Sequence, residues 1–330
     1  MRRRLLDLAW RTADRWPANR ILAGLNRGRV AVLCYHSVVD GAVPPPLRRT
    51  GLHVRLADFE AQMEALARDF DVVPLAEALA GPVRRSRPAV ALTFDDGYAN
   101  NLHLAAPVLS RLGLPATIFL VSSLLSDERP FWWDEVGLLV AGGAEGAVRI
   151  GGERVLVSGN DGGAGLAAVR RYLRTAPLVA RGPVLDELRG LARPAGQALI
   201  DLLRPLARTE LAAFPSGIVF GNHTATHRVL TEIGPADVRW EIETARDELG
   251  AMLAGRYQDV LCYPRGSTDA ATEKIVEATG TPRAVALARR RIGRSAAGAG
   301  SRPLAMPRIV VGAHFGLERF RLAARGLATG

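Results

Sequence analysis

Cysteine and long apolar runs are both scarce in this sequence. The 330 residues include two cysteines, Cys34 and Cys262, each within an apolar stretch. We therefore expect two reduced core thiols, and neither a disulfide framework nor a cysteine-based metal site. No apolar run approaches the ~20 residues that a membrane-spanning helix needs. We also find no internal repeat, no coiled-coil pattern and no recognisable nucleic-acid-binding motif.

The N-terminal stretch lacks the apolar core of a secretory signal. Asp7 and Arg11 interrupt its short apolar runs, so the sequence predicts a cytoplasmic protein. Residues 1–29 set Trp10 and Trp16 among arginines, which predicts a basic helical segment. This segment either contacts anionic lipid at the inner face of a membrane or packs on the domain as an ordinary amphipathic helix.

Acidic residues are outnumbered, and the formal net charge is +10. This balance favours anionic partners such as phosphate-bearing substrates, acidic glycans or a lipid headgroup surface. Almost all of the positive charge comes from arginine. A bias in the base composition of the genome would explain this arginine content as well as an anionic partner does. With 48% hydrophobic residues, the chain can bury the core of one barrel-sized domain or of two smaller ones.

Short β-like runs alternate with helical patterns along most of the chain. The helical patterns lie at 56–70, 75–81, 101–112, 236–253 and 269–279. The apolar, strand-like runs lie at 30–36, 71–74, 87–94, 115–123, 217–221, 259–264, 284–288 and 306–312. The alternation predicts a parallel sheet covered by helices. About seven or eight strands favour a (β/α) barrel over an open sheet.

Residues 126–215 interrupt this alternation. They contain a glycine-rich stretch followed by helical patterns rich in arginine and leucine. An unstructured loop of that length is unusual in a compact domain. We therefore predict a partly helical insertion within a barrel domain that spans 30–330.

Two strands end in side chains that suit a metal site. Asp95 and Asp96 follow one strand and precede Gly97, so one carboxylate could bind a metal while the other acts as a base; the alternative is a turn that caps the next helix. His223 and His227 follow another strand. Two histidines and a carboxylate form a recurrent catalytic metal set, and the C-terminal ends of barrel strands gather at one face. The pattern predicts a metal-dependent hydrolase.

These motifs resemble the polysaccharide deacetylase family, the NodB-homology domain. TFDDGY (93–98) and GNHTATH (221–227) resemble its first two motifs, and YHSV, ADFEAQMEAL, PATIFL and CYPRG follow the family's order. The resemblance covers roughly 30–125 and 215–312. It implies a deformed (β/α) barrel that binds a divalent metal, most often zinc. It also implies removal of an acetyl group from an amino sugar in a glycan, oligosaccharide or lipid-linked sugar.

The resemblance further implies a role for each motif residue. Asp95 would be the catalytic base, and the backbone N–H of Tyr98 would bind the oxyanion. The metal ligands would be Asp96, His223 and His227. Further candidates for contact with substrate or oxyanion are Tyr263, Pro264 and Arg265.

The sequence departs from the family pattern at two places. Many members carry an arginine two residues before the proline of the third motif, where this chain has Cys262. Arg308 or Arg265 could supply the missing cation, and we favour Arg308. The late motif that provides a histidine is also blurred. The general acid is then either His36, from an early motif that some members use, or His314; we favour His36 because it ends a barrel strand.

The remaining features leave alternatives open. We expect His53 and His103 to be surface or loop residues. The aromatic residues Phe131, Trp132 and Trp133 either stack on a sugar face or form the core of the insertion. Two other functions compete: hydrolysis of a non-sugar amide or cyclic imide on the same fold, and glycan binding by an inactive relative. The complete set of metal-ligand types argues against the latter.

Overall fold

A computed structural model describes residues 30–48, 50–81, 85–125, 129–158, 163–253, 255–287, 296–297 and 303–327. The basic segment predicted at residues 1–29 lies outside these ranges. Within them, no helix combines the length and the apolar character needed to cross a lipid bilayer.

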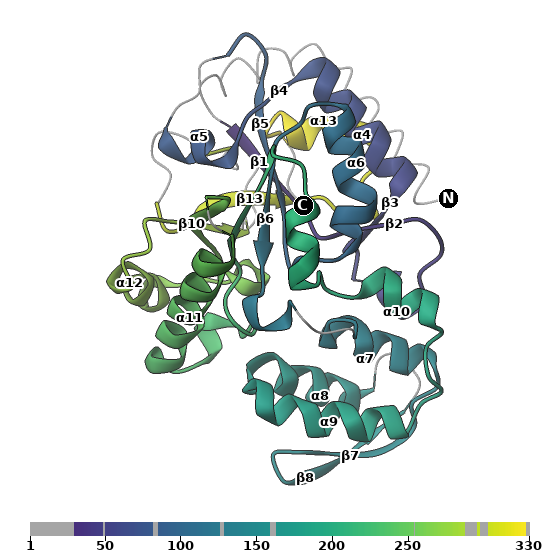
Figure 1. Ribbon diagram of the computed structural model, residues 1–330. Helices are drawn as coiled ribbons and strands as arrows, with labels where there is room; N and C mark the ends of the chain where they lie inside the picture. Colours follow the sequence, from purple (N-terminus) through teal and green to yellow (C-terminus); the bar gives the residue numbers. More distant parts are fainter. Residues whose placement is uncertain are drawn as a thin grey trace.

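Seven parallel strands close into a barrel, which confirms the predicted fold (Figure 1). In ring order they are β1 (Val30–Tyr35), β5 (Ala89–Phe94), β6 (Ala116–Leu120), β9 (Ile218–Asn222), β10 (Tyr257–Cys262), β11 (Arg283–Leu287) and β13 (Met306–Val310). Strand β13 pairs with β1 and closes the ring. Two short strands add to it: β4 (Asp71–Val72) pairs with β5, and β12 (Ala296–Ala297) pairs antiparallel with β1.

Helices cover the outside of the barrel. They are α4 (Leu56–Asp69), α5 (Leu75–Ala80), α6 (Ala106–Arg111), α11 (Pro235–Leu253), α12 (Ala270–Ala278) and α13 (Leu317–Ala324). A π-helical turn, Asn101–Ala105, precedes α6. A short parallel pair, β2 (Ser37–Val39) with β3 (His53–Arg55), and the helix α3 (Pro45–Arg48) follow β1.

Side chains alternate between the two faces of each barrel strand. In β1, Val30 and Val32 pack in an interior cluster, whereas Leu33 packs in the layer that includes residues of α4, α6 and α13. In β13, Met306 belongs to the same interior cluster. Because the side-chain period of a strand is two, Arg308 also points into the barrel. The alternation therefore brings a charged residue into an apolar interior.

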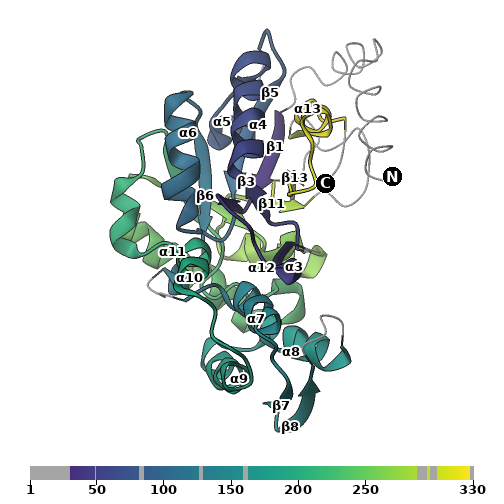
Figure 2. The same cartoon turned by 90° about the vertical axis from the view of Figure 1, so that its right-hand side faces the viewer.

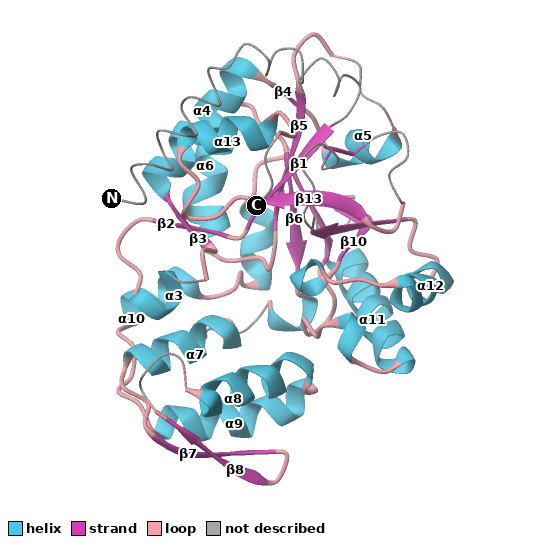
Figure 3. Ribbon diagram, turned by 180° about the vertical axis from the view of Figure 1, so that it is seen from behind, coloured by secondary structure: helices cyan, strands magenta, loops and turns pink. Residues whose placement is uncertain are grey.

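The chain between β6 and β9 forms a separate layer beyond the C-terminal ends of the strands (Figures 1 and 2). Its elements are α7 (Trp132–Ala141), β7 (Gly146–Ile150), β8 (Glu153–Val157), α8 (Ala164–Thr175) and α9 (Leu178–Gly190). The helix α10 (Gln197–Leu203) and a 3₁₀ segment, Arg208–Ala213, lead back to β9, and Leu211 packs in the outer layer of the barrel. This inserted segment has its own apolar cluster, which includes Val136, Val169 and Leu188. Figure 3 shows that it is mostly helical, as predicted, with one β-hairpin.

Candidate functional site

The turn after β5 sends two adjacent carboxylates to different partners. Asp96 and Gly97 both lie in the left-handed region, with φ of 73° and 86°. A Cβ atom at Gly97 would lie 2.6 Å from the Leu120 side chain, so the turn requires glycine. Asp95 consequently meets Arg308, while Asp96 faces the two histidines of the β9 loop.

Asp95 forms a buried, two-pronged ion pair with Arg308. Nη1 and Nη2 of Arg308 donate to Oδ1 and Oδ2 of Asp95 at 2.6 and 2.7 Å. Arg308 is 1% exposed and Asp95 is 3% exposed. Burial alone would raise the pKa of Asp95, but the charge and hydrogen bonds of Arg308 outweigh it and hold that pKa well below its usual range. The structure thus brings Arg308 to the aspartate, whereas Arg265 is exposed.

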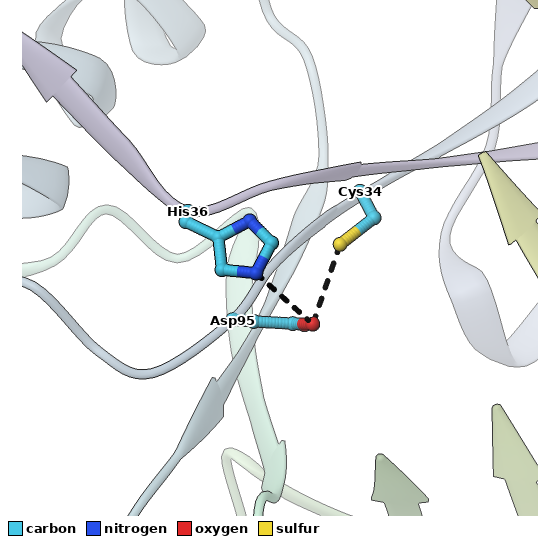
Figure 4. Close-up of side chains that lie close together, drawn as sticks. All are labelled: Cys34, His36 and Asp95. Atoms are coloured by element: carbon cyan, nitrogen blue, oxygen red, sulfur yellow. Dashed lines mark hydrogen bonds and ion pairs between the residues drawn. The ribbon is translucent and has the colours of Figure 1, made fainter. Parts of the chain in front are cut away.

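Two thiols flank this ion pair. Cys34 Sγ donates to Asp95 Oδ2 at 3.3 Å, and Arg308 Nη2 donates to Cys262 Sγ at 2.9 Å (Figure 4 shows Cys34). Both cysteines are buried free thiols, as the sequence predicted. Burial raises the pKa of each thiol, so both stay neutral beside the charged pair.

His36 also lies beside Asp95. Its Nε2 is 3.9 Å from the Oδ2 atom that Cys34 contacts, so the two side chains converge on one oxygen (Figure 4). The His36 side chain is 14% exposed, and its Nδ1 has no hydrogen-bond partner among the described residues. His314 is exposed and lines a cavity with Gly51. Of the two candidate acids, the structure brings His36 to the aspartate.

Asp96, His223 and His227 form a buried cluster with ligand atoms facing one another. Asp96 Oδ1 lies 3.3 Å from His223 Nε2 and 3.4 Å from His227 Nε2. One ligand atom from each lies within 4.8 Å of the other two. Burial alone lowers the pKa of His223, but the hydrogen bond to Asp96 and the nearby carboxylates outweigh it and raise that pKa. The residue types match the metal set expected from the sequence.

Two other groups of metal-ligand type occur among the described residues, and both include Asp95. One adds Cys34 and His36, and the other adds His223 and Cys262. Both oxygens of Asp95 already accept hydrogen bonds from Arg308, and each group depends on a thiol whose pKa is raised. The cluster around Asp96 is therefore the best candidate for a metal.

Residues 222–227, which carry the two histidines, are held from two sides. Glu241 of α11 is fully buried and accepts hydrogen bonds from the backbone N–H and hydroxyl of Thr226. Arg181 of α9, in the inserted segment, donates to the carbonyl oxygen of Thr226 at 2.6 Å. Both Thr224 and His227 adopt a positive φ, at 68° and 60°. Barrel and insertion together stabilise this unusual loop.

The expectation for His53 was wrong, because this side chain is buried. His53 is 3% exposed, and its Nε2 lies 3.3 Å from Oδ1 of the buried Asp134 in α7. Asp134 Oδ2 accepts a 2.7 Å hydrogen bond from Tyr98 OH. His103 is exposed, as expected, and contacts Glu210 at 2.9 Å. The contact of His53 with Asp134 could not be predicted, since Asp134 belongs to the insertion.

The aromatic residues at the start of α7 divide between core and site. Trp132 packs against the apolar cluster of the insertion, so the core interpretation fits Trp132. Phe131 is 2% exposed, packs with Tyr98 and Val121 instead, and stacks on Trp133. Trp133 is half-buried, and its ring centroid lies 4.5 Å from that of His227.

In the third motif, Tyr263 and Pro264 are buried, which leaves the exposed Arg265 as the accessible residue of the three.

Fold and cluster define the class of the protein: a parallel (β/α) barrel with histidines and carboxylates gathered at the C-terminal ends of its strands. A family model described as polysaccharide deacetylase matches residues 83–148 and 210–284. The matched residues include both strand ends that carry the site, and the chain is similar to this family, whose members are in general metal-dependent hydrolases.

One relative is similar over part of the chain. YxkH of Bacillus subtilis, a candidate polysaccharide deacetylase, is 34% identical over 97 residues. That match covers 28% of this chain and 32% of the relative, so it spans about a third of that protein.

Solved structures share the fold. The deacetylase PplD of Streptococcus pyogenes, in complex with acetate, matches with a TM-score of 0.54 and 16% identity, over 90% of this chain and 98% of that one. A polysaccharide deacetylase from Bacillus cereus matches with a TM-score of 0.56 and 17% identity, over 90% and 69% of the respective chains.

Proposed function

We propose that this chain is an N-deacetylase that hydrolyses the acetamido group of an amino sugar in a glycan, oligosaccharide or lipid-linked sugar. One observation carries the proposal: an ionised carboxylate, Asp95, adjoins a cluster of three metal-ligand side chains of which it is not a member. Hydrolysis of an amide by a metal enzyme needs these two functions side by side.

The cluster suits a divalent cation, and we propose zinc. His223 Nδ1 lies 2.8 Å from the carbonyl oxygen of Cys262. A carbonyl oxygen only accepts, so Nδ1 carries a proton, and Nε2 is the nitrogen that faces Asp96 and would bind the ion once it is deprotonated. Nitrogen and oxygen ligands of this kind are common at catalytic zinc sites. When bound by Asp96, His223 and His227, the ion would polarise the amide carbonyl and acidify water.

The other side chains would move protons and bind the substrate. Asp95, kept ionised and oriented by Arg308, accepts a proton from the attacking water. The Tyr98 backbone N–H has no hydrogen-bond partner among the described residues, so it can donate to the carbonyl oxygen as negative charge develops there. His36 donates a proton to the departing amine. The third motif would contact the sugar, chiefly through its exposed Arg265.

The two aspartates provide the test. Asp96→Ala should lose bound metal and activity together, because a ligand is removed. Asp95→Asn should stay folded and keep its metal, while turnover falls by roughly 10² or more, the usual scale for a lost general base. Metal content per protein and acetate released from N-acetylglucosamine oligosaccharides measure both effects. Stoichiometric zinc in a His223→Ala/His227→Ala double variant would refute the ligand assignment.

A further inference from the structure

The two histidines of the metal-ligand cluster are held in different ways. His223 donates its Nδ1 proton to the Cys262 carbonyl oxygen, which fixes the orientation of its ring. His227 has no equivalent, since its buried Nδ1 has no hydrogen-bond partner among the described residues. A histidine ligand usually depends on such an outer contact to present its other nitrogen to the metal. Another contact must therefore orient His227.

Trp133 of the inserted helix α7 makes that contact. Its ring centroid lies 4.5 Å from that of His227, with 40° between the ring planes. The indole is itself fixed, because Nε1 donates to Tyr98 OH at 2.9 Å and its face stacks on Phe131 at a centroid distance of 4.7 Å. Tyr98 OH in turn donates to the fully buried Asp134. The indole is thus a rigid surface against one face of the imidazole.

We propose that Trp133 is a positioning residue for His227, so that the inserted segment completes the metal centre. The proposal rests on the function proposed above, because it needs His227 to be a ligand. An imidazole that is already oriented loses little conformational freedom when a metal binds, and this raises affinity. Loss of a hydrogen-bonded outer partner typically weakens metal binding by about 10- to 100-fold, and we expect an effect of that order from the loss of this packing contact.

Zinc affinity of the metal-free full chain, measured by competition with a chelator, tests the role without any assay of activity. Trp133→Ala should weaken zinc binding by about 10- to 100-fold. Trp133→Phe, which keeps a ring against His227 but loses the N–H, should weaken it less. Trp240→Ala is the matched control, since Trp240 lies on α11 and is 49% exposed; its affinity should be unchanged. Wild-type affinity in Trp133→Ala would overturn the proposal.

A double-mutant cycle separates positioning from general loss of structure. In a His227→Ala background, Trp133→Ala should cause little further loss of zinc affinity, because the ring that it orients is gone. An equal loss in both backgrounds would overturn the proposal. If Trp133→Ala does not fold, Tyr98→Phe decides, since it removes only the hydroxyl that holds the indole; unchanged zinc affinity in that variant would also overturn it.

The same titrations distinguish the two proposals. If the His223→Ala/His227→Ala double variant keeps stoichiometric zinc, the proposed function fails and the role of Trp133 fails with it. If that variant loses zinc while Trp133→Ala binds normally, only the positioning role fails.

Discussion

At the scale of single residues, the two candidate general acids have very different surroundings. His36 lies at the end of β1, 3.9 Å from an oxygen of Asp95, and is mostly buried. His314 is exposed, in a segment with glycine on both sides. A proton donor for the departing amine has to lie near the reacting atoms, and only His36 is close to Asp95.

We therefore expect His36→Ala to lower turnover by about 10²- to 10⁴-fold, the range for a lost acid or base, with metal content unchanged. His314→Ala should remain within a few-fold of the wild type. Rates measured across the pH range for both variants, with metal content checked, test this. Near-normal activity in His36→Ala, together with loss of the alkaline limb in His314→Ala, would reverse the assignment.

The sequence predicted those site residues that follow directly from strand ends. Asp95, Asp96 and His223 lie where an apolar run stops, and barrel geometry gathers such positions at one face. Arg308 was favoured over Arg265 without a geometric reason; the structure supplies one, because Arg308 lies two residues from Met306, which packs in the barrel interior. His53 could not be predicted, since its burial depends on Asp134, 81 positions away in the inserted segment (134 − 53).

At the scale of elements, Glu210 fastens the end of the insertion to the barrel. It accepts hydrogen bonds from Arg204 at 2.7 Å and from the Ala207 backbone N–H at 2.8 Å, and it contacts His103 next to α6. The hydrogen bonds from Arg204 are the largest cause that lowers the pKa of Glu210 from 4.5 to about 2, against the opposing effect of burial.

This shift predicts a pH-dependent contribution to stability. Since the folded pKa is depressed, the stabilisation is present above about pH 4.5 and is lost as the pH falls towards 2. Solvent screening reduces it to on the order of 1 kcal/mol, or about 2 °C in Tm. Glu210→Gln should therefore unfold at a lower temperature than the wild type at pH 7, and the difference should shrink between pH 5 and pH 2.

Thermal unfolding followed by circular dichroism measures this difference. Glu243→Gln is the control, because the pair of Glu243 with Arg239 is exposed on α11, and surface pairs contribute little. A difference for Glu210→Gln that stays constant with pH would contradict the linkage.

Elements with a clear pattern were predictable, and irregular ones were not. The barrel strands are continuous apolar runs, and their positions agree with the structure. The first turn of the helix expected at 101–112 is instead π-helical; Pro107, which lacks an N–H to continue the α-helical pattern, lies just after it. Strands β7 and β8 alternate weakly; β7 begins with Gly146 and β8 follows Gly152. The glycine-rich composition of this stretch therefore hid both strands from prediction.

At the scale of the whole molecule, net charge and the N-terminal segment bear on where the protein acts. We propose a barrel domain over 30–330 with its insertion at 126–215, preceded by the basic segment 1–29. Removal of residues 1–26 should leave the protein folded and active on soluble substrate, because the first barrel strand begins at Val30.

The same truncation should weaken binding to vesicles that contain anionic lipid, since each arginine near such a surface contributes about 1 kcal/mol. Co-sedimentation with anionic and neutral vesicles, at low and high salt, measures the effect. Equal binding by both forms would contradict peripheral membrane contact through this segment.

The buried ion pair has a consequence for how relatives are compared. A sequence alignment would show the third motif of this chain as incomplete, because Cys262 occupies the position at which the family pattern has an arginine. A guanidinium nevertheless binds Asp95, and it belongs to Arg308 of β13. What the site needs is one guanidinium beside the aspartate, whichever strand carries it. Two arginines there would leave a buried charge without a partner, at a cost of several kcal/mol. Positions 262 and 308 should therefore vary as a pair across the family, with arginine at one and a small neutral residue at the other.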